Sequence, residues 1–125
     1  MTKLENLIKQ LKKANKRLKE AAGTNPTQMN KDATIQRFEF TFELAWKAIQ
    51  EYVRDQGFDC KSPKNCIREA ARLEVIDDPE DWFDFLKKRN LTAHTYNREI
   101  ANQIYKKAIK FPKEVDALLE KISQE

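Results

Sequence analysis

The sequence has few of the residues that interrupt helices. Its 125 residues include only two glycines and four prolines, and these are the two residues that helix interiors tolerate least. Lys, Glu, Leu and Ala, which enter helices at low cost, are common throughout the chain. This composition excludes all-β and collagen-like classes and favours long helices.

Long hydrophobic runs are also missing. No stretch approaches the roughly 20 consecutive apolar residues that a membrane-spanning helix needs, and the basic N-terminal segment has no apolar run typical of a signal peptide. We therefore predict a cytoplasmic protein that does not associate with membranes. Hydrophobic residues make up 40% of the chain and twelve residues are aromatic, which excludes disorder. The length predicts a single domain, residues 1–125.

Metal ligands and known catalytic frames are scarce. The chain has one histidine and two cysteines, too few for a zinc site, so we predict no metal and no other cofactor. Two cysteines do not make a disulfide framework, and we predict that Cys60 and Cys66 are free thiols. The sequence also lacks a glycine-rich phosphate loop and a nucleophile elbow.

Apolar residues recur at three- and four-residue spacing along most of the chain, which predicts helices. Ser62 before Pro63, Asp78 before Pro79, and Asn97 are typical N-terminal helix caps. Pro112 interrupts the last apolar pattern and should kink or break that helix near Phe111. The predicted helices cover approximately residues 3–22, 29–56, 63–73, 79–89 and 98–122.

These helices predict an all-α fold, a mainly antiparallel up-and-down bundle of four to five helices joined by short loops. In the second helix, Phe40 and Leu44 add apolar surface beyond the main hydrophobic stripe. Such a helix either lies centrally in the bundle or also serves a subunit interface. On its polar face, the spacing of Glu43 and Lys47 predicts an ion pair.

Positive charge is concentrated in the first predicted helix. Residues 1–20 hold seven lysines and arginines against two glutamates, although the whole chain has a net charge of only +4. A basic helix face can contact nucleic acid phosphates or an acidic partner, and a solvated face is the simpler interpretation. The candidates for RNA contacts are Lys12, Lys13, Lys16 and Arg17.

The segment from Arg89 to Tyr96, RNLTAHTY, contains the only histidine of the chain, His94. Arginine binds phosphate in a bidentate manner, and histidine transfers protons near neutral pH. On an uninterrupted helix these two side chains would point about 140° apart. They converge only if the helix ends between them or if a second subunit completes the site. Taken alone, a histidine in a helix junction is usually a surface or capping group.

The segment resembles the Arg-x4-His-x-Tyr motif of HEPN domains that accompany minimal nucleotidyltransferases, a family labelled nucleotidyltransferase substrate-binding proteins. Further segments resemble the same family in the expected order. They are FTFELAWK at 40–47, Gly57-Phe58 followed by Ser62-Pro63, and IREA at 67–70. The resemblance covers approximately residues 30–110.

The resemblance implies a helical bundle that forms a homodimer, with the two motifs facing each other. It also implies a metal-independent endoribonuclease toxin that cuts RNA. The antitoxin would be a cognate minimal nucleotidyltransferase that attaches AMP to the motif tyrosine. Carried over, Arg89 would hold the scissile phosphate and stabilise the charge that develops in the transition state, and Asn90 would orient the phosphate or the histidine. His94 would be the acid/base residue and Tyr96 the AMP acceptor.

Two other interpretations stay open at this point. The chain could be a non-catalytic substrate-binding subunit of a two-component nucleotidyltransferase, as the family label indicates. It could also be a basic helical protein that binds nucleic acid without catalysis, in which case binding would depend strongly on salt.

Overall fold

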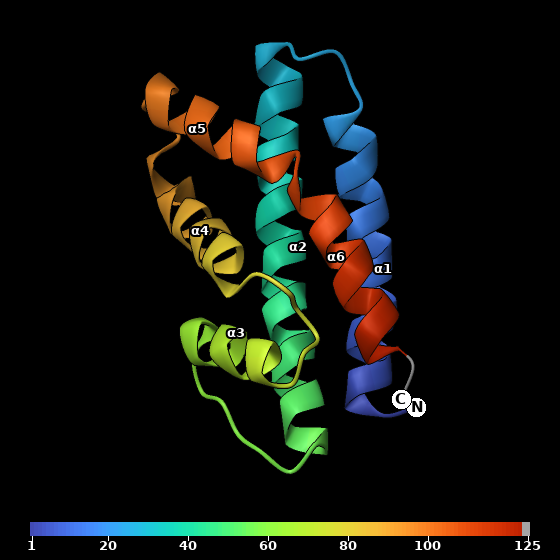
Figure 1. The fold of residues 1–125 in the computed structure, drawn as a ribbon. Helices are drawn as coiled ribbons and strands as arrows, with labels where there is room; N and C mark the ends of the chain where they lie inside the picture. Colours follow the sequence, from blue (N-terminus) through green and yellow to red (C-terminus); the bar gives the residue numbers. More distant parts are fainter. Residues whose placement is uncertain (124–125) are drawn as a thin grey trace.

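The computed structural model describes residues 1–123, and all the regular secondary structure in this part of the chain is helical (Figure 1). The predicted all-α bundle is confirmed. The described residues form six α-helices and one 3₁₀ helix, rather than four to five helices, because the last predicted helix is divided in two. The elements are α1 (Lys3–Ala22), α2 (Gln28–Asp55), α3 (Pro63–Arg72), α4 (Pro79–Asn90), η1 (Leu91–His94), α5 (Arg98–Ala108) and α6 (Phe111–Ile122).

Local capping explains most of the helix ends. The side chains of Ser62, Asp78 and Asn97 each accept a hydrogen bond from the backbone N–H three residues later, as their sequence positions predicted. Gly57 follows α2 with a positive φ of 89°, a conformation that favours glycine. The chain leaves α5 at Ala108 and starts α6 at Phe111, with Pro112 in the first turn, so the predicted break at this proline is confirmed.

The helices pack around α2, the longest element (Figure 1). In Figure 1, α1 and α6 lie on one side of α2, and α3, α4 and α5 lie on the other. Five buried aromatic rings from α2, α4 and α6 meet in the centre, with ring centroids between 4.7 and 6.4 Å apart. Each such side chain contributes about 1.5–3 kcal/mol through burial. The rings belong to Phe38, Phe42, Trp82, Phe85 and Phe111.

The prediction that the cysteines are free thiols is wrong, because Cys60 and Cys66 form a disulfide. The loop after α2 turns back on itself and brings the two Cα atoms to 5.1 Å, within the range that a disulfide spans. Both cysteines are buried. The bond therefore fixes the loop to the first turns of α3.

No helix within residues 1–123 has the length and apolar character needed to cross a membrane.

Candidate functional site

The Arg-x4-His-x-Tyr segment lies where α4 ends and η1 begins. Helix α4 ends at Asn90, and the chain tightens into the 3₁₀ turn of Leu91–His94. The Thr92 hydroxyl lies 2.7 Å from the Arg89 carbonyl oxygen and the Asn97 backbone N–H donates to the His94 carbonyl oxygen over 3.0 Å, which stabilises the turn. The helix therefore changes its winding between Arg89 and His94, as convergence of the two side chains requires.

His94 and Tyr96 form one pair of the site. The His94 Nδ1 atom lies 3.3 Å from the Tyr96 hydroxyl, and the two rings meet edge to face with centroids 5.9 Å apart. Both side chains are exposed, and Tyr96 reaches 84% of its maximal exposure. The phenol is therefore open to a macromolecular partner while it contacts the imidazole.

Arg89 and Asn90 form the second pair. The Arg89 Nη1 group donates to the Asn90 Oδ1 atom over 3.3 Å. The Nη2 group forms an ion pair with Glu43 of α2, and the side chains of both partners are about 30% exposed. Glu43 also accepts a hydrogen bond of 3.4 Å from the Trp46 indole N–H. The guanidinium group is therefore held in place from α2 and keeps part of its surface open to solvent.

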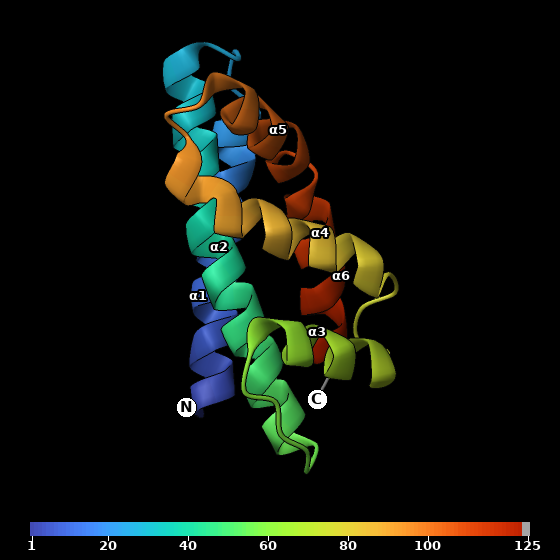
Figure 2. The same ribbon diagram turned by 90° about the vertical axis from the view of Figure 1, so that its left-hand side faces the viewer.

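The two pairs lie side by side in the sequence, but within residues 1–123 no hydrogen bond or ion pair joins Arg89 to His94. One chain thus places a guanidinium group and an imidazole at one helix junction, without a hydrogen bond or ion pair between them among the described residues. Figure 2 shows this junction, the end of α4 and the following turn, crossing α2.

Sequence reasoning missed the acidic side chains that α2 contributes to this junction. Glu43 was expected to pair with Lys47, but its carboxylate contacts Arg89. One turn earlier, the Glu39 Oε2 atom lies 3.1 Å from the Thr92 hydroxyl. The available signal was the four-residue spacing of Glu39 and Glu43 on one stripe of α2. The sequence did not reveal which element would face this stripe.

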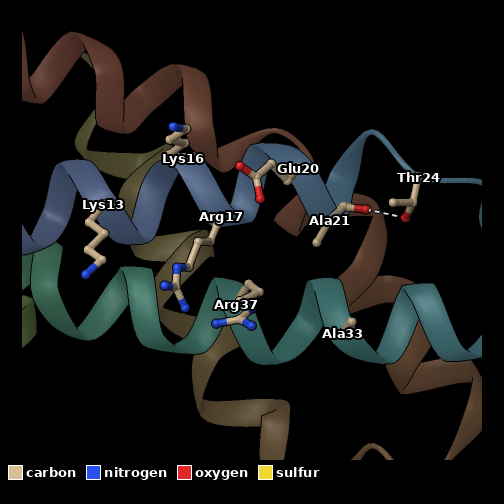
Figure 3. A pocket seen from close by; sticks show the side chains of 8 residues that line it. All are labelled: Lys13, Lys16, Arg17, Glu20, Ala21, Thr24, Ala33 and Arg37. Carbon is tan, nitrogen blue, oxygen red and sulfur yellow. Dashed lines mark hydrogen bonds between the residues drawn. The ribbon is translucent and has the colours of Figure 1, made fainter.

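The four basic candidates of α1 do not form one surface. Lys13, Lys16 and Arg17 line a groove of about 590 Å³ between α1 and α2, and Arg37 of α2 joins them (Figure 3). In Figure 3, the guanidinium groups of Arg17 and Arg37 lie close to each other. Lys12 instead lines a separate hollow beside the end of α6.

The clear pKa shifts among the described residues lie at a distance from the motif, around the contact of α4 with α5 and α6. A hydrogen bond from Lys88 lowers the pKa of Asp84, and Lys107 adds to the effect. Burial alone would lower the pKa of Lys107, but the Asp81 and Asp84 carboxylates outweigh it and raise that pKa. Burial raises the pKa of Glu114. We assign these groups to the stability of the fold.

Within residues 1–123, no group of three or more His, Cys, Asp or Glu side chains has the arrangement of a metal site.

A helical bundle that presents an Arg-x4-His-x-Tyr segment at the junction of two helices defines a HEPN-type domain. The chain belongs to the nucleotidyltransferase substrate-binding family, because its residues 2–124 match the family described as "Nucleotidyltransferase substrate binding protein like".

Three relatives support this assignment. The chain is 34% identical over 95 residues to a probable ribonuclease HepT from Haemophilus influenzae, an alignment that covers 72% of this chain and 65% of the relative. A solved structure from Thermus thermophilus superposes with a TM-score of 0.85 at 35% identity, over 90% of this chain and 98% of that one. A second structure, from Haemophilus influenzae, is described as revealing the fold of a substrate-binding domain of a nucleotidyltransferase. It gives a TM-score of 0.70 at 27% identity and covers 96% of each chain.

Proposed function

We propose that this chain is the toxin of a toxin–antitoxin pair, a metal-independent endoribonuclease that a cognate minimal nucleotidyltransferase neutralises. Both RNA and the nucleoside triphosphates used by a transferase are present in the cytoplasm, where we place the activity. The observation that carries the proposal is the complete and accessible motif at the α4–η1 junction, with Arg89 fixed by Glu43 and His94 in contact with Tyr96. The name of the HepT relative, a probable ribonuclease, supports it.

The residues suit cleavage of RNA by transesterification. A base removes the proton of a ribose 2′-OH, and the oxygen attacks the adjacent phosphorus. The bond to the 5′ oxygen then breaks, and an acid returns a proton to that oxygen, which leaves a cyclic phosphate and a 5′-OH. In this scheme Arg89 stabilises the negative charge that develops on the phosphate. Asn90 accepts a hydrogen bond of 3.3 Å from the Arg89 guanidinium and thereby orients this guanidinium.

A single histidine per chain favours a homodimer. His94 cannot act as base and as acid in the same step, whereas two copies provide one histidine for each role. Phe40 of α2 is 49% exposed and lies one helical turn from Glu43, the partner of Arg89. An interface through Phe40 would place the two motifs close to each other.

The contact between His94 and Tyr96 provides a reason for neutralisation by AMP. A phosphodiester on the Tyr96 oxygen would place a negatively charged group about one hydrogen-bond length from the His94 imidazole, since the two atoms are 3.3 Å apart. It would block proton transfer and repel the phosphate of an RNA substrate. The exposed phenol is accessible to a transferase.

RNA cleavage in EDTA by the purified protein, checked for intact mass, tests the proposal. We expect wild-type protein of unmodified mass to cut RNA and His94→Ala to lose at least about 100-fold in rate. Tyr96→Phe should keep the activity and no longer gain the mass of AMP when incubated with the transferase and ATP. Wild-type protein of unmodified mass that cuts no RNA would exclude the nuclease.

The second candidate function is a non-catalytic substrate-binding subunit of a nucleotidyltransferase. The family description and the substrate-binding domain described for the second structure favour it. It predicts a stable complex with the transferase that His94→Ala leaves intact, together with no RNA cleavage by either variant.

The basic residues of α1 stay candidates for RNA contacts. The groove lining holds four cations, Lys13, Lys16, Arg17 and Arg37, against one acidic residue, Glu20, which favours an anionic ligand. Lys12 lies outside this groove. We expect neutralisation of Lys13 and Arg17 to weaken RNA binding more than Lys12→Gln, as measured by fluorescence anisotropy at several salt concentrations.

A further inference from the structure

A second groove begins at the motif itself. It runs between α3 and α4, which lie side by side in Figure 2, and has a volume of about 660 Å³. Asn90, the partner of Arg89, lines it. We propose that this groove binds a single strand of the RNA substrate and leads it to the motif. The inference rests on the proposed ribonuclease function and adds a substrate-binding surface to it.

The charge of the groove favours a phosphodiester chain. Lys64 and Arg68 of α3 and Lys87 of α4 line it, and Glu80 is the one acidic residue among its lining side chains. Within residues 1–123, neither Lys64 nor Lys87 has a carboxylate partner, and Arg68 is bound only by the Asn65 amide oxygen at 3.4 Å. Three cations with so few partners repel one another, and bound phosphates would relieve that repulsion.

Helix stability does not explain the cation at the start of α3. Lys64 is in the first turn of that helix, where the positive end of the helix dipole disfavours a cation. Lys87, in the last turn of α4, lies at a favourable helix end. The dipole of α3 disfavours Lys64, whereas a negatively charged ligand would bind it, so ligand binding explains this cation better than helix stability does.

The apolar part of the groove lining favours an unpaired strand. Phe83, Leu86 and Leu91 line the groove and are each partly exposed. Aromatic and apolar side chains bind the flat faces of bases, which are accessible in a single strand but stacked inside a duplex. The combination of cationic and apolar side chains in the lining therefore suits single-stranded RNA better than a duplex, which would offer mainly phosphates.

The groove also has the position that the reaction requires. A strand that leaves it at Asn90 meets the Arg89 guanidinium next, because the two side chains are hydrogen-bonded. It then meets the η1 turn, which carries His94. The phosphate at Arg89 would be the scissile one, and the phosphates in the groove would contribute to affinity.

Binding is tested in the His94→Ala background, so that the RNA stays intact and the result does not depend on cleavage. The groove variant is Lys64→Gln, Arg68→Gln and Lys87→Gln combined. The control variant combines Lys106→Gln, Lys110→Gln and Lys121→Gln, three exposed lysines that lie outside the groove, with the same change of charge. The probe is a fluorescent single-stranded RNA oligonucleotide, with the same sequence as a duplex beside it.

We expect the groove variant to bind the single strand at least tenfold more weakly than the control variant. The slope of log K against log salt concentration should also become less steep by about two, because each phosphate contact to a single strand contributes about 0.7 to this slope. Duplex binding should change equally in the two variants. Equal affinities of the two variants for the single strand would overturn the inference. So would loss of transferase binding in the groove variant with RNA binding retained, because the groove would then serve the protein partner.

Further measurements distinguish these results from other causes. Circular dichroism and thermal unfolding establish that the variants are folded, and the charge-conserving pair Lys64→Arg with Lys87→Arg should restore affinity. In the active background, the groove variant should raise KM at least tenfold and leave the rate at saturating RNA within about twofold. If the proposed ribonuclease function is wrong, the wild type cuts no RNA, and this result is independent of the binding comparison between the variants.

Discussion

The contact of Glu43 differs from the one that the sequence predicted for it. Its carboxylate forms an ion pair with Arg89 and accepts a hydrogen bond from Trp46, so it fixes the direction of the guanidinium. We therefore treat Glu43 as a positioning residue. In the proposed nuclease, Glu43 would also compete with the substrate phosphate for the same cation, and the two effects would act on different kinetic constants.

We expect Glu43→Gln to lower kcat by about tenfold, since a guanidinium that is no longer oriented stabilises the transition state less well. KM should stay equal or fall, because the competing charge is gone. Steady-state cleavage of an RNA oligonucleotide measures both constants. The matched control is Glu51→Gln, which removes another α2 carboxylate that pairs with an arginine, Arg54, away from the motif. Equal kinetics in the two variants would contradict the positioning role.

At this scale the sequence predicted the place of the motif in the fold better than the contacts of its residues. The residue types and spacing of Arg89, His94 and Tyr96 were sufficient to select the junction, because a motif is a local pattern. The partner of Arg89 was not predictable, since Glu43 precedes it by 46 residues and only the packing of α4 on α2 brings them together.

Among the elements, α3 is held by a covalent bond as well as by packing. The Cys60–Cys66 disulfide closes a short loop, and the loss of chain entropy in the unfolded state makes such a bond worth about 2 kcal/mol. We expect Cys60→Ser combined with Cys66→Ser to lower the free energy of unfolding by about that amount in urea titrations. The untreated wild type should show no reactive thiol until it is unfolded and reduced. Equal stability of the wild type with and without reductant would contradict this expectation.

The contact between α4 and α5 makes stability depend on pH. Lys107 binds Asp81 and Asp84, and Lys88 donates to Asp84 over 2.8 Å. The hydrogen bond from Lys88 and the charge of Lys107 lower the pKa of Asp84 in the folded state. A lowered folded pKa stabilises the fold above the unfolded value, about 4, and this contribution disappears as the pH falls through the folded value.

Asp84→Asn should therefore destabilise the protein at neutral pH by about 0.5 kcal/mol, a small value because the Asp84 side chain is 40% exposed and solvent screens the pair. At a pH below the folded pKa, the variant and the wild type should be equally stable. Urea midpoints at neutral and acidic pH measure the difference, and Glu120→Gln, an exposed carboxylate on α6, is the control. A difference that persists unchanged in acid would mean that Asp84 stabilises the fold by another route.

Helix boundaries were the most predictable feature at this scale, because the residues that start and end a helix lie next to it in the sequence. The first helix was predicted over residues 3–22 and is observed over Lys3–Ala22, because its apolar period and its loop residues are both contained in that stretch. The break at Pro112 was also predictable, since a proline removes a helix donor wherever it lies. The disulfide was not, because the six-residue separation of its cysteines does not determine whether the loop between them turns back.

At the scale of the whole molecule, the helical periods of the sequence predict the all-α bundle. They do not predict which side chains of neighbouring helices share a groove. The sequence placed Lys12, Lys13, Lys16 and Arg17 together because they are neighbours in the chain. The structure separates Lys12 from the other three and adds Arg37 from α2, since a helix divides adjacent residues among its faces. Grooves are made by two elements, and only the packed molecule shows which residues share one.

The proposed reaction also needs two molecules. If the interface passes through α2, Phe40→Glu should place a charge in an apolar contact and convert the dimer to monomers in sedimentation experiments, with loss of RNA cleavage at the same time. Helical content should not change, because Phe40 is already 49% exposed in one chain. Phe58→Glu is the matched control, since Phe58 is 46% exposed and follows α2 in a loop.

A heterodimer of wild type and His94→Ala distinguishes a shared site from two separate ones. If one reaction uses both histidines, this heterodimer should have far less than half of the wild-type activity, because neither motif retains a base and an acid together. Half of the activity would mean that each chain works alone. A Phe40→Glu protein that stays dimeric would contradict the interface through α2. A monomer with full activity would contradict the need for two chains, and the single histidine of each chain would then need a second proton carrier such as water.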